Sequence, residues 1–202
     1  MSDVLTAFYP YYATSLHALD NNEWPLWNPF ELGGIPLMAN YQSAVFYPPR
    51  LLHSMFGLHE GTTLYILTKL WLCGMMAFLC GRAIGLRSPA ARFLSVGWML
   101  ASYNLIWCNW SLPDVSPWLP VLFLGVERIL SRRYRTGFFA IAFGGTLLLL
   151  SGHPETAFTM GLGLGFYFLC RLIYERRRWA EASHAIGVCA SGWALAITVS
   201  AA

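Results

Sequence analysis

Residues 62–81 read TTLYILTKLWLCGMMAFLCG, twenty residues that carry a single charge, Lys69. An α-helix of about 20 apolar residues crosses the hydrocarbon core of a bilayer, so this stretch has the length and composition of a membrane span. The whole chain has the same character. Of its 202 residues, 56% are hydrophobic and only 11% are charged, against roughly 25% charged in an average soluble domain. We therefore expect an all-α, polytopic transmembrane helical bundle.

Further apolar stretches follow at intervals, separated by short polar connections, and together they predict about six spans. The third is the shortest, and Pro117 and Pro120 lie near its start, so we expect a broken or tilted helix there. The chain also ends inside an apolar run, which suggests a fragment of a longer protein. The expected spans are residues 62–81, 92–110, 115–130, 137–151, 155–171 and 184–202.

The positions of arginine and lysine predict the orientation of these spans. Eleven of the thirteen lie in three segments, residues 82–92, 127–135 and 171–178, whereas the connections NWSLPDVSP (109–117) and SGHPE (151–155) carry none. Cytoplasmic loops of membrane proteins are enriched in these residues. The three basic segments are therefore expected in the cytoplasm, and residues 1–60 and the two connections without arginine or lysine on the extracytoplasmic side.

Residues 1–60 are expected to form an extracytoplasmic loop that lies on the membrane surface. Within it, residues 3–19 (DVLTAFYPYYATSLHAL) have the amphipathic character of an interfacial helix. Residues 25–52 contain several prolines, which rule out a regular helix, and many aromatic residues, which are favoured at the membrane–water boundary. The glycine pair at residues 33–34 indicates a turn.

Other function classes lack their usual signatures. The net charge is only +3, with no basic patch, so no nucleic-acid partner is expected. The five cysteines all lie in apolar stretches without CxxC spacing, which indicates neither a disulfide framework nor a metal site. No cofactor is indicated, although a divalent metal stays an open alternative.

An aspartate at position 3, the string PLWNPFELGGIPLMANYQSAVFYPPRLL (25–52) and the later SGHPE turn resemble the YfhO family of bacterial multi-pass membrane proteins. That family belongs to the GT-C class of integral membrane glycosyltransferases. The resemblance covers most of the chain and is strongest over residues 3–52. A full member has one more span before the aspartate and many more after this region, and Glu155 stands where glutamine is commoner.

The resemblance implies an inverting transfer of a sugar from a polyprenyl-phosphate donor to a glycan or lipid acceptor of the cell envelope, at the outer face of a bacterial cytoplasmic membrane. Asp3 occupies the position of the catalytic base, which takes the proton of the attacking acceptor hydroxyl. The leaving phosphate needs positive charge beside it. Arg50, in the outer loop, and Lys69, about two turns into the first span, are candidates for that contact.

The remaining candidate residues also have plainer explanations. Glu31 is a candidate for binding sugar hydroxyls and Trp27 for stacking on a sugar face, although anchoring at the interface explains a tryptophan equally well. Asp3 itself has the residue type of a helix N-cap.

His153 and Glu155 are candidates for binding donor phosphate, acceptor or metal. A polar turn that closes a helical hairpin is the plainer alternative. Asp3, Asp114 and His153 are weak candidates for metal ligands.

Two other function classes stay open. A transporter or flippase for a lipid or polymer also uses broken helices, but it is expected to carry paired charges on several spans, whereas only Lys69 lies well inside one here. A non-catalytic membrane scaffold is the second, because a shared fold does not establish activity.

Overall fold

The computed structural model describes residues 4–175 and 178–201, and these are mostly helical. A π-helical turn, Val4–Phe8, leads into the first helix. Strands are confined to one antiparallel pair of two residues each, β1 (Trp27–Asn28) and β2 (Ile35–Pro36). Three short 3-10 turns, η2 (Tyr41–Ser43), η3 (Pro48–Arg50) and η4 (Leu112–Val115), link the irregular parts. The helices are α1 (Tyr9–Asp20), α2 (Leu51–Phe56), α3 (Leu58–Ala83), α4 (Ser88–Met99), α5 (Ser102–Ile106), α6 (Trp118–Leu130), α7 (Tyr134–Leu150), α8 (Pro154–Tyr174) and α9 (Trp179–Ser200).

Three of these helices, α3, α8 and α9, are long and apolar enough to cross a membrane. They cover the expected spans at residues 62–81 and 155–171, and residues 184–200 of the span expected at 184–202. The prediction of a helical membrane protein is confirmed at this level.

The other three expected spans correspond to shorter helices, so six complete spans are not confirmed. Residues 92–110 divide into α4 and α5, because the chain leaves the helix at Leu100 and the Asn104 side-chain amide donates to the Trp98 carbonyl (2.7 Å). Only 13 residues form α6, about 20 Å of helix against a hydrocarbon core of about 30 Å. The apolar α7 has 17 residues.

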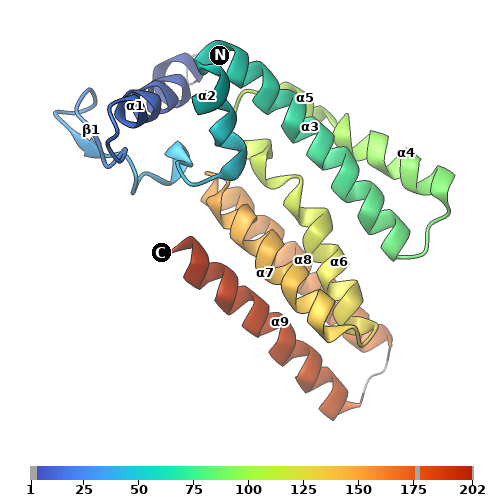
Figure 1. The fold of residues 1–202 in the computed structure, drawn as a ribbon. Coiled ribbons are helices and arrows are strands. Elements are labelled where there is room, and N and C mark those ends of the chain that lie inside the picture. Colours follow the sequence, from blue (N-terminus) through green and yellow to red (C-terminus); the bar gives the residue numbers. More distant parts are fainter. Residues whose placement is uncertain (1–3, 176–177, 202) are drawn as a thin grey trace.

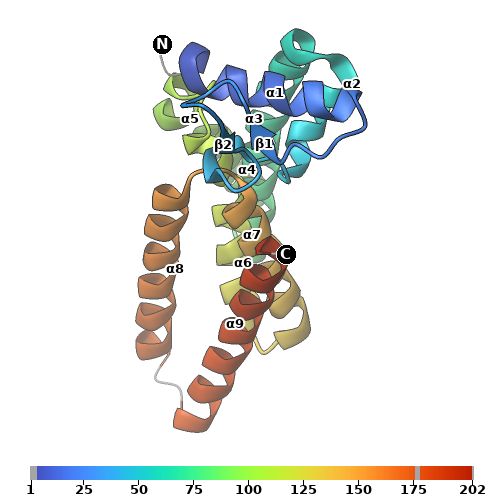
Figure 2. The ribbon, with the colours of Figure 1, turned by 90° about the vertical axis from the view of Figure 1, so that its left-hand side faces the viewer.

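Figure 1 shows that the chain connections of the bundle are sorted between its two ends. The connection from α3 to α4 and that from α6 to α7 lie at one end, together with the C-terminal end of α8 and the start of α9. The N-terminal segment, α5 and the turn before α8 lie at the other end, which we call the pole. Viewed from the side, α1 lies across the pole, and α8 and α9 run away from it (Figure 2). The arginine-rich segments thus share the end opposite the pole.

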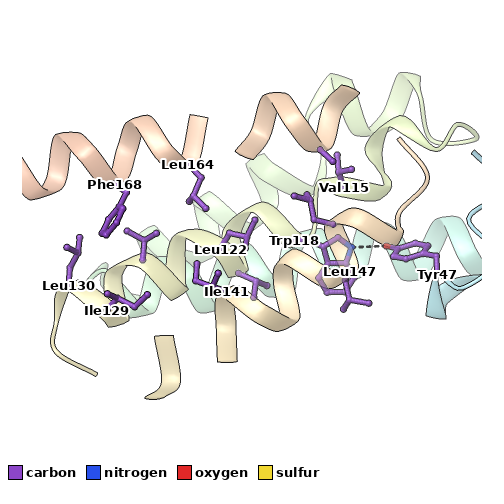
Figure 3. Packing of buried hydrophobic residues seen from close by; sticks show 14 of the residues in the cluster. Tyr47, Val115, Trp118, Leu122, Ile129, Leu130, Ile141, Leu147, Leu164 and Phe168 are labelled. Atoms are coloured by element: carbon purple, nitrogen blue, oxygen red, sulfur yellow. Dashed lines mark hydrogen bonds between the residues drawn. The ribbon is translucent and has the colours of Figure 1, made fainter. Parts of the chain in front are cut away.

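The core of the bundle lies where α6 packs against α7 and α8 (Figure 3). Leu122 and Ile129 of α6 and Ile141 of α7 are fully buried in it. Glycines allow this close approach: a Cβ built on Gly137 would stand 2.5 Å from Ile129 Cγ1. The glycines on the facing sides of α6 and α7 therefore determine how closely the two helices pack.

Candidate functional site

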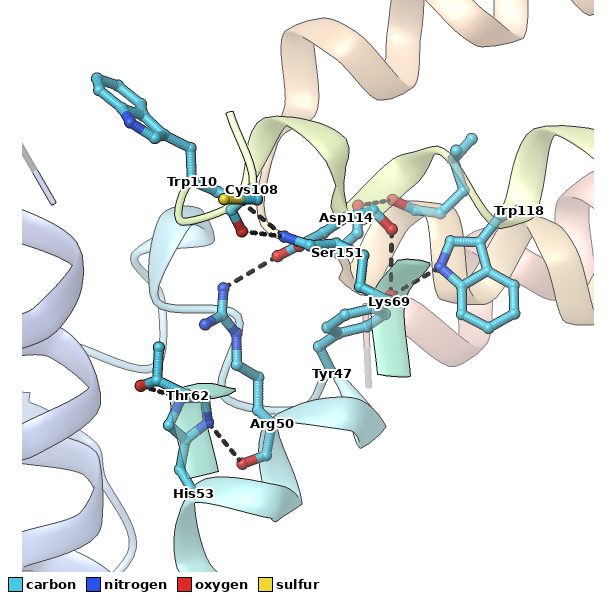
Figure 4. Close-up of polar contacts among 11 residues, drawn as sticks. Tyr47, Arg50, His53, Thr62, Lys69, Cys108, Trp110, Asp114, Trp118 and Ser151 are labelled. Carbon is cyan, nitrogen blue, oxygen red and sulfur yellow. Dashed lines mark hydrogen bonds and ion pairs between the residues drawn. The ribbon is translucent and has the colours of Figure 1, made fainter. Parts of the chain in front are cut away.

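Two features occupy the pole, a buried ion cluster and an open groove. The ion cluster is built from three elements that are distant in the sequence: Arg50 ends η3, Lys69 lies in α3, and Asp114 lies in η4 (Figure 4). Arg50 Nη2 is 3.0 Å from Asp114 Oδ2, and Lys69 Nζ is 2.7 Å from Asp114 Oδ1. The side chain of Asp114 is fully buried, and that of Lys69 is 2% exposed. One buried carboxylate is thus paired with two buried cations.

Backbone and aromatic groups complete the surroundings of this cluster. Lys69 Nζ also donates to the carbonyls of Cys108 (2.8 Å) and Trp110 (3.3 Å). The Tyr47 hydroxyl donates to the Asp114 carbonyl (3.1 Å) and accepts from the Trp118 indole N–H (3.0 Å). The ammonium group therefore has three acceptors and each oxygen of the carboxylate has a partner, which is the condition for tolerating charges in a buried place.

Arg50 connects the cluster to the N-terminal helix. Its guanidinium lies 3.8 Å from the ring centroid of Tyr12 in α1 and 4.3 Å from that of Tyr65 in α3, a cation–π contact on each side. Burial on its own lowers the pKa of Arg50, but the neighbouring Tyr12, Tyr65 and Asp114 raise it overall, so the group stays charged. Arg50 therefore fixes α1 over the end of α3.

His53 of α2 closes the cluster on the side of α3. Its Nδ1 lies 3.2 Å from the Arg50 carbonyl, and its Nε2 lies 3.2 Å from Thr62 Oγ1. Burial, aided by the positive charge of Arg50, lowers the pKa of His53 to about 4. The imidazole is consequently neutral at pH 7.

These contacts change the interpretation of three candidate residues. Arg50 and Lys69, the candidates for binding a lipid phosphate, are both paired with Asp114. The carboxylate of Asp114, a weak candidate for a metal ligand, is engaged by these two cations. Within residues 4–175 and 178–201, no group of three or more His, Cys, Asp or Glu side chains is placed to hold a metal ion.

The open groove lies between the first two helical segments and the turn that follows β1. Its volume is about 590 Å³, within the usual range for small-ligand sites. Glu31 is held in it by two hydrogen bonds, from the Tyr11 hydroxyl to Oε1 (3.3 Å) and from Asn28 Nδ2 to Oε2 (3.3 Å). The lining residues are Thr6, Pro10, Ala13, Thr14, His17, Asn28, Phe30 and Glu31.

Exposed aromatic side chains lie in the lining of this groove and outside it: Phe30 lines the groove, whereas Trp27 does not. Phe30 is 80% exposed and Trp27 is 55% exposed. The Trp27 ring lies on the backbone of Gly34, where a Cβ would come within 2.5 Å of the ring, and Gly34 has a φ of +117°. Only glycine meets both conditions at once, so Gly34 holds Trp27 in this orientation.

The remaining candidates lie apart from this arrangement. His153 acts as the N-cap of α8, because the Thr156 backbone N–H donates to its Nδ1 (3.3 Å). Glu155 is exposed on the first turn of the same helix. This agrees with the plainer alternative, a polar turn that starts a helix. Asp3 lies outside the described residues.

The sequence interpretation did not single out His17 and Asn28, which line the groove, or Tyr11, which donates to Glu31. A signal for His17 was present, because residues 6, 10, 13, 14 and 17 recur at helical spacing and share one helix face. No such signal exists for Asn28, whose side chain accepts from the Phe30 backbone N–H (3.0 Å) and shapes the turn locally.

Comparison of the chain with models of protein families, with curated proteins and with solved structures gave no match. The proposal of a function therefore rests on the geometry of the pole.

Proposed function

We propose that the chain is part of a membrane glycosyltransferase that transfers a sugar from a polyprenyl-phosphate donor to a cell-envelope acceptor at the outer face of a bacterial cytoplasmic membrane. The observation that carries the proposal is the groove at the pole. It combines a fixed carboxylate, an imidazole, an amide and hydroxyl groups with exposed aromatic rings. Such polar groups bind sugar hydroxyls by hydrogen bonds, while aromatic rings cover the apolar face of a sugar.

Each group has a role in this proposal. Glu31 accepts hydrogen bonds from sugar hydroxyls, because its oxygens are already oriented by Tyr11 and Asn28. Trp27, which is exposed outside the groove lining, stacks on the part of the sugar that extends beyond the groove. Asp3, three residues before Thr6 of the groove wall, is the base that accepts the proton of the acceptor hydroxyl.

Arg50 and Lys69 have a positioning role here instead of a direct contact with phosphate. Their ion pairs with Asp114 join η3, α3 and η4, and the stacking of Arg50 on Tyr12 fixes α1, which forms one wall of the groove. In this proposal the substrate site and the buried ion cluster are connected through α1.

The test is sugar transfer from a radiolabelled lipid-linked donor, measured in membranes that contain the full-length protein. Asp3→Asn and Glu31→Gln should each lower transfer, Asp3→Asn by about 10²-fold or more, since a general base contributes that much. Both variants should insert into the membrane at wild-type levels. Glu155→Gln, at an exposed position outside the groove, is the matched control and should leave transfer unchanged. Wild-type transfer by the Asp3 and Glu31 variants would overturn the proposal.

One observation favours a transporter or flippase as the second candidate. The structure pairs charges on several helices, Lys69 of α3 with Asp114, and Arg171 of α8 with Glu127 of α6 (3.2 Å), which is the mark expected of a transporter. The two functions predict different products. A transporter moves the lipid-linked sugar between leaflets of a vesicle without forming a new glycosidic bond, whereas a transferase forms the bond without moving the donor.

A further inference from the structure

The buried ion cluster at the pole carries an unbalanced positive charge. Arg50 and Lys69 contribute two positive charges, and Asp114 is the only carboxylate that pairs with either of them in the part of the chain that the structure describes. The neighbouring imidazole of His53 is neutral at pH 7, because its pKa is about 4. A net charge taken out of water is costly unless a counter-charge accompanies it.

The two cations differ in how far their donors are used. Lys69 has three acceptors for its three N–H groups, namely Asp114 and two backbone carbonyls. Arg50 has one side-chain hydrogen bond, from Nη2 to Asp114, and its Nε is buried without an acceptor. Figure 4 shows the second terminal nitrogen of Arg50 turned away from Asp114. The Tyr12 hydroxyl is also buried without a partner. The buried donors without an acceptor are therefore Arg50 Nε and the hydroxyl of Tyr12, whose ring stacks on Arg50.

A small cavity lies beside Arg50 and Tyr12. Its volume is about 50 Å³, and Tyr12, Ser15, Ser43, Arg50, His53 and Ser54 contribute to its lining. A volume of about 10–15 Å³ already admits one water molecule. The cavity is consequently large enough for a monatomic anion with water beside it, and too small for a bulky organic anion.

We propose that this cavity binds a small monovalent anion of the halide class, held by the guanidinium of Arg50. The anion balances the second cation and supplies the acceptor that Arg50 lacks. Because Arg50 and Tyr12 join α1 to the bundle, the anion stabilises the attachment of α1 to the pole. This site is separate from the open groove, so it does not depend on the proposed transferase activity.

The test uses the purified full chain in detergent and measures Tm while sodium gluconate is replaced by sodium chloride at constant ionic strength. We expect a saturable rise of about 2–4 °C in chloride. Ser15→Leu should abolish the rise, because it fills the cavity and leaves all three ions in place. Ser183→Leu is the matched control, since Ser183 also donates to its own helix but is exposed on α9. General effects of the salt on Tm act equally on the Ser15→Leu and Ser183→Leu variants, so a difference between them reports binding in the cavity.

A direct measurement separates an anion from water. Crystals grown in sodium bromide should show anomalous scattering from bromide in this cavity. A Tm that is the same in chloride and gluconate, an equal rise in the Ser15→Leu variant, or water without bromide in the cavity would each overturn the proposal.

Discussion

Asp114 is the residue on which the buried charges of the pole depend, and its loss should cost more than the loss of a cation. Asp114→Asn leaves Arg50 and Lys69 buried without their carboxylate, which should lower the free energy of unfolding by about 3–5 kcal/mol. Lys69→Met leaves the neutral Arg50–Asp114 pair and should cost less. Thermal unfolding of the purified variants in detergent measures both effects.

An exposed ion pair supplies the control for this prediction. Arg132 lies 2.8 Å from Glu181, and its side chain is 66% exposed. Arg132→Gln should change stability by less than about 1 kcal/mol, because solvent screens such pairs. If Lys69→Met proved more damaging than Asp114→Asn, the charge balance assigned to the cluster would be wrong.

His53 gives the pole a dependence on pH with a definite sign. Its pKa is about 4 in the folded chain against an ordinary value of 6.5, so the unfolded state binds more protons between these two values. The contribution to stability is complete above pH 6.5 and is lost as the pH falls towards 4. Tm should therefore be lower at pH 5 than at pH 7.

Substitution of His53 isolates this effect from other titrating groups. His53→Asn removes the titration and keeps a donor for the Arg50 carbonyl, so its Tm should fall less between pH 7 and pH 5. His17→Asn, at an exposed position on α1, should retain the wild-type fall. An unchanged fall in the His53 variant would show that other groups cause it.

Among the elements, the pair α6 and α7 depends most on glycine. A Cβ on Gly137 would stand 2.5 Å from Ile129 Cγ1 and 2.9 Å from the Gly125 carbonyl oxygen. Gly137→Ala should force the helices apart and cost about 1–3 kcal/mol. Gly163→Ala in α8, where no atom lies within 4 Å of the new Cβ, should be neutral or gain up to about 1 kcal/mol from helix propensity. Thermal unfolding of the two variants compares them, and equal losses would contradict this packing.

Sequence patterns predicted the elements that depend on local composition. The stretches at residues 62–81 and 155–171 are apolar and lie in long helices, and α9 contains residues 184–200 of the third stretch, predicted at 184–202. The stretch at 92–110, also expected to form one span, is broken, because the Asn104 side chain bonds a carbonyl four residues before its own helix begins. Hydropathy alone does not register a single side-chain bond of this kind.

The ion cluster could not be predicted from the sequence for a different reason. Arg50, Lys69 and Asp114 are separated by 19 and 45 residues along the chain, and their pairing depends on how η3, α3 and η4 meet. The sequence marks Lys69 as an unusual charge within a span, but it does not give the partner. Tertiary contact decides whether such a cation binds a substrate or a carboxylate.

At the scale of the whole molecule, the sorting of connections between two ends predicts an orientation in the membrane. The connections that carry arginine lie opposite the pole (Figure 1), and the positive-inside rule assigns them to the cytoplasm. A reporter fused after residue 112 should therefore report an extracytoplasmic position, and one fused after residue 133 a cytoplasmic position. A fusion after residue 86, between Arg82 and Arg87, should also report the cytoplasm and serves as an independent control. The reverse pattern would place the groove with Glu31 and Trp27 on the cytoplasmic side, away from the acceptors of the cell envelope, and the proposed transfer at the outer face would then have to be abandoned.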